Sequence, residues 1–449
     1  MWYFLYNVLL IVVSPVIFLI LLAKKRCRHG IPQRLGWYRS ESANPESTQP
    51  VIWVHAVSLG EVVAAVPLIR MLHARHADYQ LIVTTVTETG REAVEQRLAR
   101  VAEHRYVPLD FPWVVSSVVK KLRPTLFICV ETELWPNLLR ILSCRGVPVV
   151  LVNGRLSSQS YRGYRLIRPL MKQMLACVTS CLMQSRRDAE RITNLGAPAD
   201  RVVCTGNIKF DQPVPDMEKT DADGLRNLLL TGDEELFVAG STHPGEEEQL
   251  MACYRMLLQQ YPGLVLLLAP RHIERAAQVE AVAIAQGFAF VRRSLLPSGC
   301  VPPKGPRVII LDTRGELATV YRYAVATFVG GTFVPIGGHN LLEPAISCKP
   351  VFFGPYTDHC AEIADLLLRA EGGRQVAGGA ELAMHVAAVL NDRSALERMG
   401  RAAQQVVLEN RGALEQTVEV VTRLLSARTG TASHQPDSLS VKCLAEKSR

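Results

Sequence analysis

The 449-residue sequence lacks the short motifs of several common enzyme classes. It contains no G-x-G-x-x-G fingerprint, which argues against a dinucleotide-dependent dehydrogenase, and no G-x-x-x-x-G-K-[ST] phosphate-binding loop. The G-x-S-x-G and H-E-x-x-H patterns of many hydrolases are also absent. No internal repeat with the period of a solenoid occurs.

Aromatic residues are scarce at 6%, but 48% of the residues are hydrophobic and 20% are charged. This balance allows sizeable buried cores and excludes a chain that is disordered throughout. The length exceeds that of one ordinary core, so two or three domains are expected.

Cysteine is present without a recognisable pattern. The chain has 11 cysteines, an odd number, and none of them forms a C-x-x-C pair. This distribution indicates reduced, buried thiols in a reducing compartment, and it predicts no metal site.

Positive charge exceeds negative charge. Lys and Arg number 50 against 42 Asp and Glu, which gives a formal net charge of +8. Taken alone, this excess leaves nucleic acid, an anionic membrane surface and a phosphorylated substrate open as partners.

Residues 1–23 carry no charged side chain and are followed by Lys24, Lys25, Arg26 and Arg28. As a helix, this run rises about 34 Å at ~1.5 Å per residue, enough for a hydrocarbon core of about 30 Å. The charges follow the apolar run, which does not fit a cleavable signal peptide. We expect a transmembrane or membrane anchor with the following chain in the cytoplasm. The alternative is a buried helix or a helix lying in one leaflet.

After a basic flank and polar linker at residues 24–50, short apolar runs alternate with helical stretches in two series. Continuous apolar strands indicate parallel sheets that are buried on both faces. We predict an α/β fold of two Rossmann-like, doubly wound domains facing a cleft, with ligands at the carboxyl ends of the strands. The predicted segments are 51–209 for the N-terminal domain, 210–222 for a linker, 223–426 for the C-terminal domain and 427–449 for a disordered tail.

Two acidic motifs follow apolar runs of the first domain. Glu61 comes after the run at residues 51–57, where a helical stretch begins, and Glu131 and Glu133 follow the run at residues 126–130. Complementing a helix dipole would explain Glu61, and a solvated loop would explain one of the other pair. Their positions at strand ends make them candidates for catalytic carboxylates, with these alternatives left open.

Glycine-rich and basic motifs occupy the second half. Gly330-Gly331 follows a predicted strand, and Gly337-Gly338 precedes a helical stretch that carries Glu343. Backbone N–H groups of such turns can bind an anion, and Glu343 is placed to accept hydrogen bonds from a ribose. A turn followed by a capped helix is the alternative. With Arg271 after a further strand and Lys209 at the domain join, the pattern predicts nucleotide-dependent group transfer.

Taken together, the motifs of the sequence resemble those of the 3-deoxy-D-manno-octulosonic acid (Kdo) transferases. These are inner-membrane glycosyltransferases with the GT-B fold. The motifs that carry the resemblance occur in the family's order: HAVSLGE, ETELWPN, NGRLS, GNIKFD, GSTHPGEE, APRH, DTRGEL and GGHNLLEP. Each motif alone is modest, but all of them in order behind an apolar N-terminus make a specific match up to about residue 415.

The resemblance implies residue roles. Glu61 matches the proton acceptor, and Glu131 and Lys209 match positions assigned to transition-state stabilisation. Arg314 departs from the family pattern, because many relatives have Met there. The segments matching the CMP-binding positions are Pro270, Arg271, Arg314, Gly315, Glu316, Asn340, Leu341, Leu342 and Glu343.

The resemblance also implies CMP-Kdo as donor, the tetraacylated lipid A precursor as acceptor and inversion at the anomeric carbon. Because a nucleoside monophosphate leaves readily, cationic and N–H groups suffice, and no metal or other cofactor is expected. The implied location is the bacterial inner membrane, with the catalytic body on the cytoplasmic side. Anionic lipids then account for the basic flank and the basic stretch from Arg155 to Lys172, and nucleic acid is no longer expected.

Two alternatives to this assignment remain. The first is another GT-B enzyme that uses a UDP-sugar, such as a lipid-linked glycosyltransferase or a sugar-nucleotide epimerase. The second is a non-catalytic, membrane-tethered nucleotide-binding protein.

Overall fold

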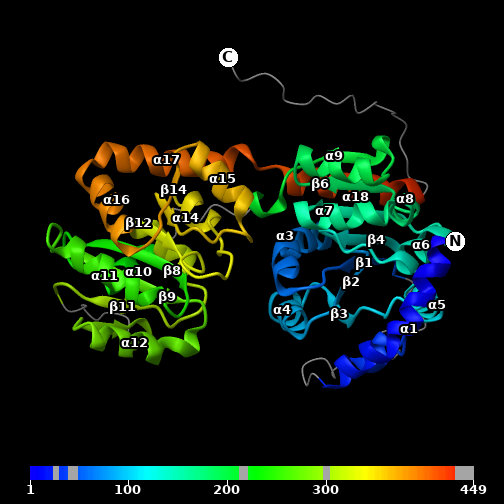
Figure 1. The fold of residues 1–449 in the computed structure, drawn as a ribbon, viewed down its shortest axis with the longest axis horizontal. Helices are drawn as coiled ribbons and strands as arrows, with labels where there is room; N and C mark the ends of the chain where they lie inside the picture. The colour runs from blue at the N-terminus through cyan, green and yellow to red at the C-terminus, as the bar shows by residue number, and fades with distance from the viewer. Residues whose placement is uncertain (24–29, 39–48, 212–220, 297–303, 430–449) are drawn as a thin grey trace, which may run out of the picture. The chain divides into compact units, whose positions relative to one another are not determined.

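The computed structural model describes residues 1–23, 30–38, 49–211, 221–296 and 304–429. The chain divides into two compact units, which are unit 1 (Met1–Asp211 with Gly412–Arg449) and unit 2 (Gln212–Arg411). Each unit contains one seven-stranded sheet (Figure 1). Most of the predicted flank and linkers at residues 24–50 and 210–222, and the predicted tail beyond residue 429, lie outside the described residues.

The sheet of unit 1 consists of short strands that pair in parallel, in the order β3-β2-β1-β4-β5-β6-β7. All five residues of β1 are buried, as expected for an apolar run with helices on both faces. The strands are β1 (Val51–His55), β2 (Gln80–Thr85), β3 (Glu103–Tyr106), β4 (Pro124–Val130), β5 (Val149–Gly154), β6 (Ser180–Met183) and β7 (Val202–Cys204).

Helices cover both faces of this sheet, because alternate strand residues point to opposite sides. Trp53 and Phe127 belong to a core with helices α5, α6 and α8, whereas Ile52 and Val54 belong to a core with α3, α4 and α18. The helices of unit 1 are α1 (Trp2–Ala23), α2 (Ile31–Arg34), α3 (Leu59–Arg75), α4 (Glu88–Leu98), α5 (Pro112–Leu122), α6 (Pro136–Cys144), α7 (Ser158–Leu166), α8 (Arg168–Leu175), α9 (Arg186–Leu195) and α18 (Ala413–Thr429).

The N-terminal run forms the predicted helix, α1, and the first turns of this helix pack against the rest of unit 1. Tyr3 is buried beneath the guanidinium of Arg140, 4.7 Å from the ring centroid. The Tyr6 hydroxyl donates to Asp110 Oδ2 at 2.9 Å, and Asn137 Nδ2 donates to Asn7 Oδ1 at 2.6 Å. Within the part of the chain that the structure describes, no helix is both long enough and apolar enough to cross a bilayer.

Helix α18 belongs to unit 1, whereas the sequence prediction placed residues up to 426 in the second domain. One face of α18 completes the core that contains β1 and α3, and in Figure 1 this red helix lies among the helices of unit 1. Asp211 fixes its start, because its carboxylate accepts the N–H groups of Gly412 and Leu414, each at 2.7 Å. The apolar residues of that face are Leu414, Val418, Val421 and Leu425.

Unit 2 repeats the parallel design, with the strand order β10-β11-β9-β8-β12-β13-β14. Its strands are β8 (Glu235–Thr242), β9 (Leu264–Pro270), β10 (Phe290–Arg292), β11 (Val308–Ile310), β12 (Ala324–Val329), β13 (Val351–Phe353) and β14 (Gly373–Gln375). Its helices are α10 (Asp221–Leu229), α11 (Glu247–Leu258), α12 (Ala276–Ala285), α13 (Leu317–Val320), α14 (Leu342–Ile346), α15 (Ala361–Arg369), α16 (Gly379–Asn391) and α17 (Arg393–Glu409).

We predict that Leu425→Ala destabilises unit 1, by about 2–5 kcal/mol, because it opens a cavity under α18. Leu425 is only 2% exposed. All 5 tryptophans of the chain lie at or before residue 135, so tryptophan fluorescence during urea unfolding reports on unit 1 alone.

The matched control is Glu419→Ala, an exposed position on the same helix, which should change the unfolding free energy by less than about 0.5 kcal/mol. If both variants unfold at the wild-type urea concentration, α18 does not stabilise unit 1.

Candidate active site

Glu61 lies in the first turn of α3, just after β1 ends. Its carboxylate is held on the protein side, because Oε2 accepts the N–H of Val57 at 2.7 Å and Oε1 accepts the hydroxyl of Ser58 at 3.0 Å. Both partners lie within four residues of Glu61, so the strand-to-helix turn itself orients the group.

The environment of Glu61 favours its protonated form. Burial raises its pKa to about 7, and the negative charges of Glu133 and Glu131 act in the same direction. The hydrogen bonds from Val57 and Ser58 oppose this increase but do not cancel it. A carboxyl group whose pKa lies near neutrality suits a general base.

The second acidic motif forms the loop between β4 and α6. Glu131 adopts a left-handed backbone conformation with φ of 59°, which is uncommon for a residue with a Cβ. Its Oε1 lies 3.4 Å from Nζ of Lys209. Glu133 accepts the indole N–H of Trp135 at 3.2 Å, and burial raises the pKa of Glu133. The structure therefore brings the three predicted residues Glu61, Glu131 and Lys209 into one neighbourhood of unit 1.

A buried amide network positions Lys209. Asn153, at the end of β5, accepts the N–H of Ile208 through Oδ1 at 3.1 Å, and its backbone carbonyl accepts Nε2 of Gln184 at 2.9 Å. Gln184 in turn accepts from Asn207 Nδ2 at 3.2 Å, and Asn207 Oδ1 accepts the N–H of Lys209 at 3.0 Å. This chain of hydrogen bonds connects the motifs NGRLS and GNIKFD, which are far apart in sequence. Both motifs therefore hold the segment that carries Lys209.

His55, the last residue of β1, was not singled out from the sequence as a site residue. It is fully buried, its ring packs edge-on against Trp135 with centroids 5.7 Å apart, and burial lowers its pKa to about 4. Nδ1 lies 3.0 Å from Oγ1 of Thr84, whereas Nε2 has no hydrogen-bond partner among the described residues. Neutral His55 thus supports Trp135, which in turn binds Glu133.

In unit 2, the predicted residues lie in loops that follow β9, β11 and β12. Strands β9 and β12 flank β8 in the sheet, and β11 pairs with β9. Pro270 ends β9, and the exposed Arg271 follows it with its N–H donating to the carbonyl of Thr242 at 3.0 Å. Burial is the main cause that lowers the pKa of both His243 and His339, and the charge of Arg271 adds to it, which places these three side chains near one another.

His243 and His339 connect the loops after β8 and β12. Neither histidine was assigned a role from the sequence. The Nε2 atoms of His243 and His339 are 2.7 Å apart, and their rings stack with centroids separated by 5.0 Å. Burial is the main cause that lowers the pKa of each, to about 4 for His339. At neutral pH both rings are uncharged, so one nitrogen donates and the other accepts. His243 lies in the motif GSTHPGEE, so this motif could have identified it from the sequence.

Glu246 shapes the glycine-rich turn after β12. Its buried carboxylate accepts four backbone N–H groups, from His243 at 2.9 Å, Gly331 at 2.8 Å, Thr332 at 3.1 Å and Phe333 at 2.9 Å. A Cβ added at residue 330 would lie 2.5 Å from a backbone oxygen, so glycine is required there. The predicted Gly330-Gly331 turn is thus held by a carboxylate from the opposite loop.

Arg314, Gly315 and Glu316 follow β11 in the order the motif predicts. The Arg314 side chain is 70% exposed and pairs with Glu274 at 3.2 Å on the surface. Gly315 has φ of 88°, a conformation that favours glycine, and Glu316 accepts from Arg293 at 2.9 Å. The backbone of this turn is therefore fixed, whereas Arg314 points to solvent.

Asn340 and Glu343 lie at the start of the short helix α14. Asn340 Oδ1 accepts the N–H of Leu342 at 3.1 Å, and its Nδ2 donates to Oε1 of Glu343 at 3.1 Å. The side chains of Leu341 and Leu342 are buried, so only their backbone groups are available to a ligand. The predicted helix is present but has only five residues, Leu342–Ile346.

Comparison with known proteins gives consistent matches. A sequence model of the family described as "3-Deoxy-D-manno-octulosonic-acid transferase (kdotransferase)" matches residues 29–212. The chain is 37% identical over 426 residues to the 3-deoxy-D-manno-octulosonic acid transferase of Haemophilus influenzae, covering 94% of this chain and 98% of that protein. It is 32% identical over 402 residues to the enzyme of the same description from Bordetella pertussis, with 87% and 90% covered.

Solved structures resemble the chain at the level of the fold. The UDP-GlcNAc 2-epimerase of Neisseria meningitidis has a TM-score of 0.57 at 12% identity, covering 83% of this chain and all (100%) of that one. A glycosyltransferase from Rickettsia africae has a TM-score of 0.54 at 12% identity, with 84% and 99% covered. The predicted GT-B-like α/β fold is thereby confirmed.

We predict that Glu246→Gln destabilises unit 2 by about 1–3 kcal/mol. An amide NH₂ in place of one carboxylate oxygen would face backbone N–H donors and leave them without an acceptor. Unit 2 contains no tryptophan, so its unfolding should appear in circular dichroism while the tryptophan fluorescence transition of unit 1 stays unchanged.

Glu248→Gln, at an exposed position two residues along the chain, is the control and should unfold like the wild type. Equal stability of the two variants would show that the carboxylate does not hold the turn.

Proposed function

Because the chain belongs to the 3-deoxy-D-manno-octulosonic acid transferase family, we propose that it transfers Kdo from CMP-Kdo to a hydroxyl group of the lipid A precursor, with Glu61 as the base. It is a glycosyltransferase, and the family resemblance stated from the motifs is confirmed. The transfer would contribute to lipopolysaccharide biosynthesis.

One observation supports the choice of base above all. Glu61 is a half-buried carboxyl group with a pKa of about 7, placed at a strand end beside the Glu131–Lys209 pair. At neutral pH a substantial fraction is ionised, and its conjugate acid is weak enough to retain a proton taken from a sugar hydroxyl. Such matching of the pKa to the working pH is what general-base catalysis requires.

The proposed step is an inverting displacement. The acceptor oxygen attacks the anomeric carbon of Kdo while Glu61 accepts the hydroxyl proton. The bond between that carbon and the phosphate oxygen breaks, and its electron pair leaves with CMP. Lys209, oriented by the amide network, supplies positive charge near Glu131 and would stabilise the negative charge that develops during transfer.

Unit 2 would hold the donor. Arg271 would offer a cation and the His243–His339 pair an imidazole N–H for the phosphate, and the glycine turn fixed by Glu246 would shape the backbone beside them. Asn340 and Glu343 would bind the ribose, and the Gly315–Glu316 turn would contact CMP through its backbone. We propose that these groups stabilise the leaving phosphate without a metal ion.

We also propose that unit 1 binds the cytoplasmic face of the bacterial inner membrane. Large apolar side chains of α1 are exposed, among them Phe4 at 70%, Leu9 at 61% and Val12 at 69%. Helices with such exposed faces lie in the headgroup region of bilayers, and basic side chains strengthen the binding to anionic lipids.

We predict that Glu61→Gln lowers kcat by about 10²–10⁴-fold, the usual contribution of a general base, because the amide cannot accept the hydroxyl proton. Transfer is measured with CMP-Kdo and the lipid acceptor by mass spectrometry of the product. CMP binding, measured by calorimetry, should keep the wild-type Kd, since Glu61 belongs to unit 1 and the nucleotide groups to unit 2. Full activity of Glu61→Gln would disprove the assignment of the base.

The pH dependence offers an independent check. With a base whose pKa is about 7, kcat/KM should rise with pH up to roughly neutrality and then level off. Glu133→Gln removes a negative charge that raises the pKa of Glu61, so the ascending limb should move to lower pH.

Glu92→Gln, an exposed carboxylate on α4, removes the same charge elsewhere and should leave the limb in place. A limb that moves equally in both variants, or in neither, contradicts the proposed coupling.

A further inference from the structure

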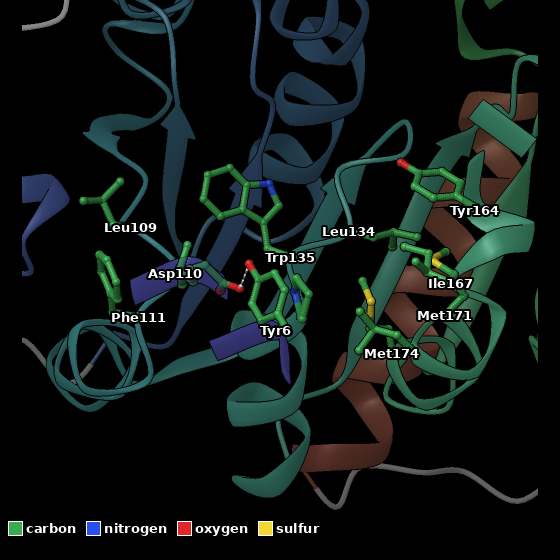
Figure 2. A pocket seen from close by; sticks show the side chains of 13 residues that line it. Tyr6, Leu109, Asp110, Phe111, Leu134, Trp135, Tyr164, Ile167, Met171 and Met174 are labelled. Carbon is green, nitrogen blue, oxygen red and sulfur yellow. Dashed lines mark hydrogen bonds between the residues drawn. The ribbon is translucent and has the colours of Figure 1, made fainter. Parts of the chain in front are cut away.

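Unit 1 contains a pocket of about 480 Å³ that none of the residues proposed for catalysis lines (Figure 2). Its wall is formed by the first half of α1, the segment at residues 109–111, the loop at residues 134–136, and helices α7 and α8. The side chains are mainly aliphatic or aromatic, with Leu134, Ile167, Met171 and Met174 on one side in the view. A pocket of this volume is of the size that binds small ligands.

The polar groups at the base of the pocket are already hydrogen-bonded. Asp110 accepts the hydroxyl of Tyr6 at 2.9 Å and the N–H groups of Asn137 and Leu138 at 2.9 and 2.8 Å. The indole N–H of Trp135 donates to Glu133. These groups therefore offer little to a polar ligand, and the apolar lining favours a hydrocarbon chain.

The pocket adjoins the carboxylate site. The loop that carries Glu131 and Glu133 continues into Leu134 and Trp135, which line the pocket. Tyr164 lines it from α7. Burial raises the pKa of Tyr164, and the charge of Glu133 acts in the same direction, so the two side chains are close. A ligand in the pocket thus lies next to the neighbourhood of Glu61.

Positive charge accompanies the wall formed by α7 and α8. Arg162, Arg165, Arg168 and Lys172 are exposed, and no carboxylate of the described chain lies within 4.0 Å of their cationic groups. Their unneutralised charge fits a ligand with an anionic head and a hydrocarbon tail.

We propose that this pocket binds one acyl chain of the lipid acceptor while the basic side chains of α7 and α8 contact an acceptor phosphate. This inference rests on the proposed function. An acyl chain anchored in the pocket would hold the acceptor's reacting hydroxyl at a fixed distance from the pocket. The pocket would act as a recognition element that selects acylated acceptors and presents them to Glu61. Binding energy from such a remote part of a substrate contributes to orientation at the reacting centre.

The test is a substitution that places a larger side chain in the pocket. Ile167 lines it and is 39% exposed, whereas the adjacent Leu166 is 85% exposed and does not line it. Each methylene excluded from an apolar site costs about four-fold in affinity. Ile167→Trp should therefore raise KM for a long-chain acceptor at least ~10-fold, with KM for CMP-Kdo unchanged. Leu166→Trp, the matched control, should behave like the wild type.

Acceptors with shortened acyl chains distinguish the pocket from general distortion. With them, Ile167→Trp and the wild type should have the same KM, because the chain no longer reaches the filled volume. A KM for the long-chain acceptor that stays at the wild-type value, or one that rises equally for both acceptors, overturns the proposal while leaving the transfer reaction established.

A binding measurement separates the pocket from the activity. An acceptor brominated on its acyl chains should quench the fluorescence of Trp135, and Trp135→Phe should lose most of that quenching. This result stands even if no Kdo transfer is detected, in which case only the proposed function fails. Equal quenching by a brominated phospholipid at the same concentration would show an unselective lipid site and overturn the proposal.

Discussion

The parallel direction of every strand is the constraint on which both groups of predicted site residues depend. Parallel strands end at the same edge of a sheet, so loops that are far apart in sequence meet there. In unit 1 this brings the loops after β1, β4 and β5 to one edge, and with them Glu61 and Glu131. In unit 2 it brings together the loops after β8, β9, β11 and β12. The local hydrogen bonds then determine which atom of each loop is available to a ligand.

Burial has opposite consequences in the two units. In unit 1 it raises the pKa of Glu61 to about 7 and also raises the pKa of Glu133, so that Glu61 can take up a proton near neutral pH. In unit 2 it lowers the pKa of His243 and His339, so that two imidazoles can share a hydrogen bond without mutual repulsion. The same desolvation thus yields a proton acceptor in one unit and neutral donors in the other.

The sequence predicted the parts of the fold that are encoded locally. Strands β1, β4, β8 and β9 were found because they are continuous apolar runs, buried on both faces. The four edge strands β3, β7, β10 and β14 were missed, and so was β6, since each has only three or four residues.

Long-range packing was not predictable in the same way. The amphipathic pattern of α18 indicates a buried face but not the core that buries it, so the helix was placed in the wrong domain. The apolar N-terminal run indicates a helix, but not that Tyr3 and Tyr6 pack against unit 1. Among the site residues, motif order located Glu61, Glu131 and Lys209. The contributions of His55 and Glu246 depend on contacts across the sheet edge, which no single motif contains.

Because α18 returns to unit 1, the chain passes between the units twice, near residues 211 and 412. Unit 2 is therefore an insertion within unit 1, and the two are not consecutive modules. An exchange of the second unit between relatives, by recombination or by design, needs two junctions. Asp211, which caps the returning helix, marks where the first should lie. A single crossover in the linker would replace α18 along with unit 2. The core of unit 1 would then pack against a helix from a different protein.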